Sequence, residues 1–580
     1  MYRSMSDDAV LWLLGDQLNP DLDALADADE VLLIEAHGFA DRKRYHAHKL
    51  TLVFSAMRHF RDDLRERGHD VTYVTAPSFG DGLDEFLAAR PAADLRLMRP
   101  ASHGAGERLR ELVAARGGSL ELLDNELFWT TPADWREWTD EPDREGAGPD
   151  AEREPIVAED GTAERRYRQE DWYRHVRRET GVLMDDEGPV GGEWNYDDLN
   201  QETPPDDWEP PERPRFDPDD LTRETHAWVR ERFDTWGSDS LDAFAWPVTR
   251  EEARAALDAF VRDRLPSFGR YEDAMAAGEP FLSHSLLSPA INLGLLDPRE
   301  PVRAVEEAYG ERGVEPGAYD PADDPAGGGS GATTLDAFSE GVESDAGADD
   351  GDDGDDAGGT DPAPVPLNAA EGFIRQVIGW REFTRHVYRE AMPELASANR
   401  LDQSRALPPA YWDGDTDMRC LSEAVGHVRE YGYAHHIERL MVLSNVALLY
   451  GADPAELNEW FHLGFVDAYH WVTTPNVVAM GSFGTDVLSS KPYAASGSYV
   501  NRMSDYCASC PYAVSRTTGE GACPLNALYW DFLAEHEETL RGTGRMGLMY
   551  SHLDDKDDSE LAAIRERAGA VREMAANGEL

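Results

Sequence analysis

Residues 9–18 read AVLWLLGDQL, a short apolar run that ends in a glycine and polar residues. Four further apolar runs follow it along the first part of the chain: 31–34 (VLLI), 71–74 (VTYV), 95–98 (LRLM) and 120–123 (LELL). A segment of helical length, 45–67, separates the second run from the third. Short buried strands that alternate with helices are typical of a parallel, doubly wound sheet, because helices cover both of its faces. The sequence therefore predicts an α/β domain over residues 1–130.

Polar side chains stand where the first two predicted strands end. Asp16 and Gln17 follow the first strand directly, and Glu35 follows the second. Doubly wound sheets bind ligands beyond the carboxyl ends of their strands, so these three side chains are placed to hold a small molecule. The residues alone favour a plainer interpretation, in which Asp16 only caps a helix.

Changes in composition divide the rest of the chain. Residues 131–221 are rich in Trp, Pro and charged side chains with weak periodicity, which predicts a partly ordered connector between two domains. Residues 222–580 show helical apolar spacing almost throughout, which predicts an all-α domain. Clear examples are 250–264 and 371–390. An insert at about 320–366 interrupts this domain with GGGSG and acidic repeats, and predicts a flexible loop.

The composition is strongly acidic. The 580 residues include 114 Asp and Glu against 55 Lys and Arg, for a formal net charge of −59, and only four of the basic residues are Lys. Because 41% of the residues are hydrophobic, a wholly disordered acidic protein is excluded. An acidic, Lys-poor surface is typical of a halophilic protein that stays soluble in concentrated salt. The same charge argues against nucleic acid as a partner, because a polyanion normally attracts a positive surface.

The chain shows no sign of a membrane or secreted protein. It contains no run of about 18 apolar residues, so we expect no membrane span. The first eight residues lack the features of a signal peptide, and four cysteines are too few for a secreted disulfide-rich protein. These features predict a cytoplasmic protein whose thiols are free to bind a metal.

All four cysteines fit one pattern. Cys420 is followed by Cys507, Cys510 and Cys523, which form a C-x2-C-x12-C motif. A CxxC turn presents two thiolates to one metal centre, and the two outlying cysteines can complete a set of four ligands. Spacing alone allows tetrahedral zinc or a [4Fe–4S] cluster, and buried free thiols are a third possibility.

Four other motifs place polar or aromatic residues at suggestive spacings, and each has a plainer structural explanation. They are SHSLLSP at 283–289, RQVIGWREF at 375–383, YAHHIERLM at 433–441 and the aromatic residues around 460–471. Hydroxyl groups ahead of a helix can hold phosphate, but they are also ordinary helix caps. A histidine of the adjacent pair can act as a proton donor, although a lone His on an apolar helix is more often structural. Crowded Trp and Tyr side chains can relay electrons to a redox cofactor, or simply fill a core.

Together these motifs resemble the prokaryotic iron–sulfur branch of the photolyase/cryptochrome family, the deoxyribodipyrimidine photolyase-related proteins. The resemblance runs over nearly the whole chain. It is carried by LLGDQL at 13–18, HKLTLVFSAMRHF at 48–60, RRETGVLMDDEGPVGGEWNYDDLN at 177–200, FGRYEDAM at 268–275, SHSLLSPAINLGLL at 283–296, EGFIRQVIGWREF at 371–383, YAHHIERLMVLSN at 433–445, DAYHWVTTPNVVAMGSF at 467–483 and KPYAASGSYVNRMSDYCASC at 491–510. It implies the family fold, an α/β antenna domain followed by an all-α flavin domain, and leaves the acidic insert outside the pattern.

The resemblance also implies bound groups and the residues that hold them. It implies FAD in the helical domain, a [4Fe–4S] cluster on the four cysteines and a ribityl lumazine antenna in the α/β domain. The residues matched to FAD are Tyr271, His284, Ser285, Leu287, Ser288 and Asn292 on the phosphate side, and Arg381, Asp467 and Asn476 along the flavin. The antenna matches Asp16, Gln17 and Glu35. Gln376, His435, His436 and Tyr493 match the lesion pocket, and Trp460 and Trp412 match an electron route.

The implied activity is light-driven repair of ultraviolet pyrimidine photoproducts, with the (6–4) type as the expected lesion. Reduced FAD gives an electron to a flipped-out lesion, and His435 or His436 gives a proton. We expect a monomer that acts on UV-damaged DNA. A blue-light receptor with the same cofactors and no repair activity is the alternative, because one fold supports both. A metal protein that binds single-stranded nucleic acid through its aromatic residues is a third hypothesis.

The sequence departs from the family pattern at three positions. Phe461 stands where Tyr is common, Thr473 where a carboxylate is frequent and Glu193 where Lys is usual. The first departure leaves open how electrons pass beyond Trp460. The negative charge is compatible with DNA if a local cluster of Arg borders the cavity, and we expect one built from residues such as Arg375, Arg502 and Arg516.

Overall fold

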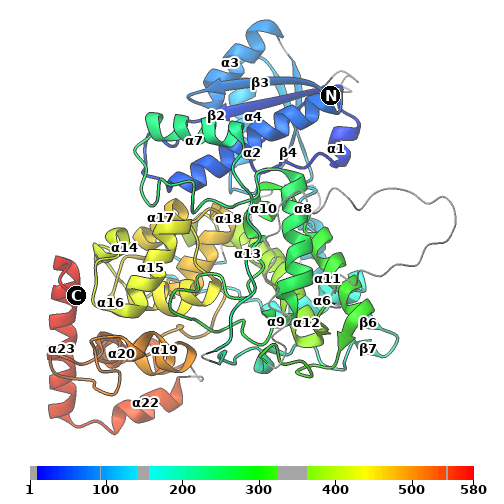
Figure 1. The fold of residues 1–580 in the computed structure, drawn as a ribbon. Helices are drawn as coiled ribbons and strands as arrows, with labels where there is room; N and C mark the ends of the chain where they lie inside the picture. The colour runs from blue at the N-terminus through cyan, green and yellow to red at the C-terminus, as the bar shows by residue number, and fades with distance from the viewer. Residues whose placement is uncertain (1–8, 92, 140–155, 206, 323–361, 544–545) are drawn as a thin grey trace, which may run out of the picture.

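A computed structural model describes residues 9–91, 93–139, 156–205, 207–322, 362–543 and 546–580. Figure 1 shows a sheet with its helices at one end of the molecule and a larger helical lobe beside it. Most of the acidic insert expected at 320–366 lies outside the described residues, so its flexibility stays a prediction.

Five parallel strands form the sheet of the N-terminal lobe. They are β1 (Val10–Leu13), β2 (Glu30–Ala36), β3 (Asp70–Ala76), β4 (Asp94–Met98) and β5 (Ser119–Leu123), in the order β3-β2-β1-β4-β5. The chain runs outward from β1 to β3 and then returns to place β4 on the other side of β1. The carboxyl ends of β1 and β4 therefore form the switch point where such sheets bind ligands. The predicted doubly wound domain is confirmed.

Helices cover both faces of the sheet because alternate residues of each strand point to opposite sides. Leu11 and Leu13 belong to the same core as α2 (Ala47–Glu66), whereas Val10 and Trp12 pack with α3 (Phe79–Ala89) and α4 (Ala105–Ala114). The short α1 (Asp23–Ala26) follows β1. Helix α7 (Asp220–Arg232) lies against α2, so most of a helix that the expected boundary at 222 assigned to the helical domain packs on the N-terminal lobe.

The connector between the lobes is more ordered than its composition predicts. It contains α5 (Pro132–Trp138), α6 (Gln169–Thr180), the hairpin strands β6 (Met184–Asp185) and β7 (Gly188–Pro189), and the 3-10 helix η1 (Asp197–Leu199). Trp172 and Tyr173 of α6 are completely buried, and the ring of Trp135 stacks on that of His386 in the C-terminal lobe. Periodicity within the connector cannot reveal these contacts, because their partners lie far away in the sequence.

From 250 onward the regular elements of the described residues are helices, as expected, apart from the short strands β8 (Gly313–Val314) and β9 (Val365–Pro366). The α-helices are α8 (Arg250–Ala259), α9 (Leu265–Phe268), α10 (Ser288–Leu293), α11 (Arg299–Arg312), α12 (Leu367–Ile374), α13 (Glu382–Ala391), α14 (Ala410–Asp413), α15 (Arg419–Tyr431), α16 (Asn445–Tyr450), α17 (Pro454–Gly464), α18 (His470–Thr474), α19 (Gly497–Met503), α20 (Pro524–Glu535), α21 (Glu537–Leu540), α22 (Gly547–Asp554) and α23 (Asp558–Asn577). The 3-10 helices η5 (Glu394–Ser397) and η8 (Tyr506–Ala508) join them. The segments η2 (Phe260–Arg264), η4 (Arg375–Arg381), η6 (Glu438–Ser444) and η7 (Pro475–Gly481) are π-helical.

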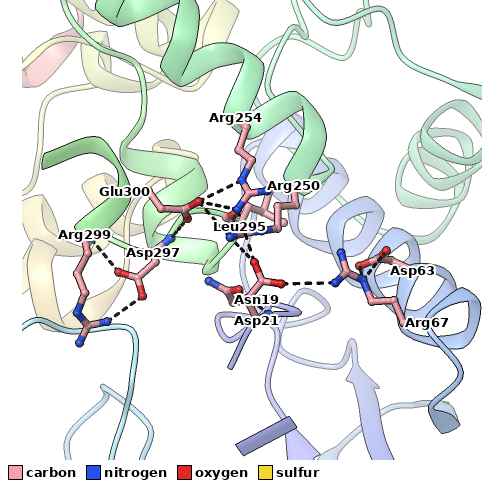
Figure 2. A network of polar contacts seen from close by, with 10 residues as sticks. All are labelled: Asn19, Asp21, Asp63, Arg67, Arg250, Arg254, Leu295, Asp297, Arg299 and Glu300. Carbon is pink, nitrogen blue, oxygen red and sulfur yellow. Dashed lines mark hydrogen bonds and ion pairs between the residues drawn. The ribbon is translucent and has the colours of Figure 1, made fainter. Parts of the chain in front are cut away.

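A network of ion pairs joins the two lobes (Figure 2). Asp21, just before α1, accepts hydrogen bonds from Arg67, which follows α2, at 3.4 Å and from Arg250 of α8 at 2.7 Å. Arg250 also pairs with Glu300 of α11 at 3.1 Å. The sheet edge and the helical lobe are therefore linked through side chains of both.

Candidate functional site

Three histidine rings meet in the helical lobe. The ring of His284 stacks on that of His435, with centroids 4.5 Å apart and planes at 18°, and the ring of His436 lies 5.3 Å from that of His284. His284 comes from the loop before α10, and the other two lie just ahead of the π-helix η6. His284 is also the residue predicted on the phosphate side of FAD, and its position there stays a prediction.

The three histidines differ in exposure. His284 and His435 are buried, and burial lowers the pKa of each well below its ordinary value, so both rings are neutral at pH 7. Neither ring nitrogen of His435 has a hydrogen-bond partner among the described residues. The side chain of His436 is 45% exposed, and its Nε2 lies 3.4 Å from Oδ1 of Asp273. A molecule that arrives from solvent therefore meets His436 first.

A buried carboxylate lies beside the histidines. The two carboxylate oxygens of Glu272 accept hydrogen bonds from Gln376 Nε2 and Asn200 Nδ2, each at 3.0 Å. Its main-chain oxygen lies 3.2 Å from Nε2 of His284, and burial raises the pKa of its side chain. Gln376 thus reaches the histidine cluster through Glu272. Tyr493 is also assigned to the lesion pocket. It is partly buried against the hydrophobic core formed mainly by the C-terminal helices.

The three arginines of the cluster expected around the cavity have different neighbours. The side chain of Arg375 is 13% exposed and pairs with Asp197 of η1 and, at 3.3 Å, with Glu371. Arg502 lies over the ring of Tyr499 at 5.3 Å. Arg516 lies in the loop that carries the last three cysteines, next to Gly519. Carboxylates from its own helix and from the connector neutralise the charge of Arg375, and the cluster stays a prediction.

A buried guanidinium holds the loop that leads to α10. Arg264 of η2 donates hydrogen bonds to the main-chain oxygens of Phe281 at 3.0 Å and His284 at 2.9 Å, and also to that of Leu282. Burial lowers the pKa of Arg264 to about 10, so it stays charged at pH 7. Leu282 and Leu286 have positive φ angles, which cost conformational free energy in residues other than glycine. The sequence did not point to Arg264, because its partners are main-chain carbonyl groups, which every residue has.

Asp467 is the polar centre of the neighbouring part of the site. Arg439 pairs with its carboxylate at 3.0 and 3.1 Å, and Ser288 Oγ donates to the same carboxylate at 2.7 Å. Asn292, one turn later on α10, donates to the main-chain oxygen of Asp467 at 2.9 Å. Burial opposes the charge on Asp467, but the Arg439 guanidinium outweighs burial and lowers the pKa of the carboxyl group. Sequence reasoning identified Ser288, Asn292 and Asp467, and it missed Arg439.

The remaining side chains assigned to a flavin lie on adjoining elements. The buried guanidinium of Arg381 pairs with Glu382 and lies over the ring of Phe128 at 4.3 Å. Asn476 Oδ1 accepts a hydrogen bond from Trp380 Nε1 at 3.0 Å, which joins η7 to η4. The others belong to the segment before α10: Tyr271 and Leu287 are buried, and Ser285 is half-buried.

Of the three ligand residues predicted at the carboxyl edge of the sheet, Glu35 and Gln17 form hydrogen bonds within the protein. Glu35 accepts two hydrogen bonds from Arg58, at 2.8 and 2.9 Å, and one from the hydroxyl of Tyr73. The amide of Gln17 ties the end of β1 to the end of β4. Asp16 caps no helix, since α1 begins only at Asp23, and burial raises the pKa of Asp16 to about 6. Of the three, Asp16 remains the side chain most open to a ligand.

The four cysteines line one cavity, together with Gly497 and the rings of Tyr506 and Tyr512. Among the described residues, no three of the four sulfur atoms all lie within 4.8 Å of one another. The thiolates around one tetrahedral zinc would be about 3.8 Å apart, given a Zn–S bond of about 2.3 Å. Burial raises the pKa values of the Cys420 and Cys523 thiols, and that of Cys507 to about 11. The sulfur atoms are thus spread more widely than a single zinc ion requires.

Three tryptophan rings run from the interior of the helical lobe to its surface. Trp460 is completely buried, Trp236 is 7% exposed and Trp412 is 40% exposed. The ring centroids of Trp460 and Trp236 are 6.3 Å apart, and those of Trp236 and Trp412 are 5.4 Å apart. Sequence reasoning named Trp460 and Trp412, but it missed Trp236, which lies in the distant segment between α7 and α8.

Comparison with known proteins identifies the family. The family model described as deoxyribodipyrimidine photo-lyase-related protein matches residues 11–145 and 155–246. A (6-4) photolyase from Agrobacterium fabrum is 35% identical over 570 residues, which cover 96% of this chain and 98% of that protein. The chain belongs to the photolyase-related family. The resemblance stated from the sequence motifs is therefore confirmed.

A solved structure places the chain in the photolyase/cryptochrome fold. A cryptochrome from Synechocystis aligns with a TM-score of 0.50 at 11% identity, over 97% of this chain and 98% of that one. A bacterial class III photolyase from Agrobacterium tumefaciens aligns with a TM-score of 0.46 at 13% identity, over 99% and 98% of the two chains. In the part of this photolyase-related chain that the structure describes, no helix has the length and apolar character to cross a bilayer.

Membership of this family implies FAD, and the chain offers partners for such a group. Several buried polar atoms have no hydrogen-bond partner within the described ranges: Arg381 Nε, His435 Nδ1 and Tyr469 Oη. His435 Nε2 and Glu438 Oε2 also form no hydrogen bond, although they lie 3.5 Å from each other. They lie on η4, at η6 and just before α18, near the polar residues already assigned to a flavin. A dinucleotide cofactor would satisfy donors and acceptors of this kind, which otherwise cost free energy in the interior.

Proposed function

We propose that this protein is a DNA photolyase that uses light to repair ultraviolet pyrimidine photoproducts of the (6–4) type. The observation that carries the proposal is the extent of similarity to the (6-4) photolyase of Agrobacterium fabrum, 35% identity over 96% of the chain. The arrangement of the histidines supports it, because the half-exposed His436 stands in front of two buried neutral rings. Such a group suits proton transfer to a molecule that enters from solvent.

FAD would be held by three parts of the chain. Asp467 with Ser288 and Asn292, Arg381 of η4, and Asn476 of η7 supply charged and amide groups on adjoining elements. Reduced FAD, when bound and excited by light, supplies the electron for bond cleavage. The lesion must leave the base stack to come near it, and a damaged pair costs less to open than an intact one.

The residues around the lesion have separate tasks. His436 gives a proton to the lesion, because it is the exposed member of the cluster. His435 stays neutral behind it, so it adds no positive charge that would repel a protonated His436. Glu272 accepts a hydrogen bond from the amide of Gln376, which orients that amide at the pocket. Tyr493 is proposed to contact the lesion from the neighbouring core.

The test uses DNA that carries one defined (6–4) photoproduct. We expect illumination of the reduced holoprotein to restore the two pyrimidines, as measured by chromatography of the digested DNA. His436→Ala should lower the repair rate by about 100-fold or more without loss of bound flavin. His552→Ala, at an exposed position outside the site, is the matched control. Unchanged repair by His436→Ala would remove His436 from the mechanism.

One observation favours a second candidate, a light receptor that does not repair DNA. Asp273 lies beside His436, Asp197 lies on the connector, and Arg375 is already paired with carboxylates. Acidic groups at the pocket oppose DNA, whose phosphates attract positive side chains. A flavin that responds to light, in a holoprotein that restores no pyrimidines in the same assay, would favour the receptor.

The four cysteines are proposed to hold a [4Fe–4S] cluster. Their meeting in one cavity supports this proposal, because four thiolates are the usual ligand set of such a cluster. We expect about four iron and four sulfide per chain in protein purified without oxygen. A single zinc per chain would refute the cluster.

A ribityl lumazine antenna is proposed at the carboxyl edge of the sheet. Asp16 supports this site, because its carboxyl group is partly buried, does not cap a helix and lies at the switch point beside β4. We expect Asp16→Asn to weaken retention of the lumazine, measured by its absorbance after gel filtration. Equal retention by the variant would place the antenna elsewhere.

A further inference from the structure

The tryptophan line has graded burial and comes from three separate segments. Trp460 lies in α17, Trp412 in α14 and Trp236 in the loop between α7 and α8. Exposure increases from 0% through 7% to 40% along the line. Its two steps, 6.3 and 5.4 Å between ring centroids, are contacts between neighbouring rings. The line therefore connects the interior to solvent without a gap.

The buried end of the line lies near Asp467, which is proposed to hold the flavin. The ring of Trp460 lies 5.8 Å from that of Phe465. The guanidinium of Arg439 lies over Phe465 at 4.4 Å, and Arg439 pairs with Asp467. An electron that leaves Trp460 thus starts two side chains away from the polar centre of the flavin site.

Besides Phe465, which lies toward the proposed flavin site, three aromatic rings next to Trp460 compete to be the next carrier. They are Phe461 at 5.2 Å, Tyr411 at 5.2 Å and Trp236 at 6.3 Å. Phenylalanine is too hard to oxidise to carry a hole, so the comparison is between the tyrosine and the tryptophan.

Proton chemistry decides against the tyrosine. A phenol that loses an electron becomes a strong acid and must lose its proton at once. The hydroxyl of Tyr411 donates to the main-chain oxygen of Leu443 at 2.6 Å, and a carbonyl oxygen is not basic enough to take a proton. Burial raises the pKa of Tyr411, which also opposes loss of its proton.

Trp236 does not meet this obstacle. An indole can lose an electron and keep its proton, so it needs no base. Its buried Nε1 has no hydrogen-bond partner within the described part of the chain. The positive charge therefore moves on to Trp412 without a coupled proton transfer at Trp236.

We propose that Trp236 carries the electron hole from Trp460 to Trp412 when light reduces the flavin of this protein. Trp460 gives one electron to the light-excited, oxidised flavin, Trp236 refills Trp460, and Trp412 refills Trp236. Water takes the indole proton of Trp412 at the surface, and a dissolved thiol then returns one electron and one proton to that ring. The inference rests on the proposed function for the flavin, and it assigns to Trp236 the step that Phe461 cannot perform.

Light-driven reduction of the bound flavin in the presence of a dissolved thiol measures this route. We expect Trp236→Phe to slow the reduction by about tenfold or more. Trp412→Phe should have the same effect, and because this ring is largely exposed the variant should fold normally. Trp172→Phe is the matched control, since Trp172 is also buried with an Nε1 that has no hydrogen-bond partner among the described residues, but belongs to another aromatic cluster.

Transient absorption separates electron transfer from a structural role. The wild type should show a long-lived tryptophan radical, whereas in Trp236→Phe the radical should stay on Trp460 and decay faster by charge return. Mass spectrometry should find oxidised Trp412 after long illumination of the wild type without thiol, and little in Trp236→Phe. Normal reduction in Trp236→Phe, or a larger loss in Tyr411→Phe, would overturn the proposal.

A second assay distinguishes this inference from the proposed function. With flavin reduced chemically beforehand, Trp236→Phe should repair a (6–4) lesion at the wild-type rate, because the tryptophan line is then not needed. Failure of the pre-reduced wild type to repair would instead refute the photolyase function, and the reduction assay would still test Trp236.

Discussion

His46 is a buried histidine whose neutral form is part of the fold. Its Nδ1 accepts the backbone N–H of His48, and its Nε2 bonds the main-chain oxygen of Arg429 at 3.0 Å, so it caps α2 and ties it to α15. Burial, reinforced by repulsion between the two rings, lowers the pKa of His46 to about 3, and burial lowers that of His48 to about 4. Below about pH 6.5 these histidines therefore bind protons in the unfolded chain but stay neutral in the folded protein until the pH is much lower.

We predict that stability falls as the pH is lowered from about 6.5 toward 4. Both pKa values are lower in the folded state, so the stability that the neutral rings contribute is fully present above the unfolded pKa and is lost below it. The loss should approach about 1.4 kcal/mol per pH unit for each histidine. Urea unfolding of the wild type and of His46→Gln across this range measures it. The variant should show a shallower slope, and equal slopes would contradict the prediction, with His552→Gln as the exposed control.

Arg264 offers a second prediction for a single residue. Arg264→Leu leaves several buried main-chain oxygens without a donor, so the free energy of unfolding should fall by about 3–5 kcal/mol. The loop that carries His284 and leads to Ser288 should loosen, and flavin retention should fall with it. Arg262→Leu is the matched control, because Arg262 is more exposed and pairs with its neighbour Asp263, and it should cost about 0–1 kcal/mol. A small loss for Arg264→Leu would mean that water replaces the guanidinium.

Among the elements, the π-helical segments are the ones that build the site. Arg375–Arg381 (η4), Glu438–Ser444 (η6) and Pro475–Gly481 (η7) each carry or adjoin residues assigned to flavin or lesion. A π-turn widens the helix by one residue and redirects the side chains that follow, and it occurs often at functional sites. The sequence correctly predicted helices here, but the 3.6-residue period does not report such turns.

The loop and helix around the cysteines yield a prediction for glycine. A Cβ atom at Gly497, the first residue of α19, would lie 2.7 Å from Sγ of Cys523. Gly497→Ala should push this thiolate out of place, lower the iron content of the purified protein and cost about 1–3 kcal/mol. Gly542→Ala, where a Cβ meets nothing within 4 Å, should leave iron content unchanged. Full iron content in Gly497→Ala would show that Cys523 moves without harm, or that it is not a ligand.

On the scale of the whole molecule, the net charge of −59 opposes folding in dilute solution. Ion pairs such as Asp21 with Arg67 and Arg250 offset some repulsion between the lobes, but the basic residues are too few to pair with all carboxylates. Salt screens the remaining repulsion, since the Debye length falls from about 10 Å at 0.1 M to about 3 Å at 1 M.

We therefore predict that the thermal midpoint rises as NaCl increases from about 0.1 M to above 1 M. Circular dichroism at several salt concentrations measures this midpoint. Potassium chloride should act as sodium chloride does, because screening depends on ionic strength rather than on the cation. A midpoint that is flat or falls with salt would contradict the halophilic interpretation of the composition.

The sequence by itself was sufficient for features that depend on local pattern or on rare residue types. Five apolar runs predicted the five parallel strands, because a strand that is buried on both faces consists mostly of apolar residues. Four cysteines in one pattern predicted that Cys420 meets the distant C-x2-C-x12-C motif, and the combined motifs led to the family. The acidic composition is likewise a property of the chain and needs no structure.

Only the tertiary structure decided which distant side chains meet. In the folded chain, the ring of His284 stacks on that of His435, and Arg375 pairs with Asp197. Arg264 donates hydrogen bonds to main-chain oxygens of the loop before α10. The fold also brings Trp236 between Trp460 and Trp412. Neither the position of Trp236 in the sequence nor the residues next to it indicate this contact. The physical reason is that periodicity reports which face of an element is buried. The identity of the partner across that face is fixed by how the elements pack.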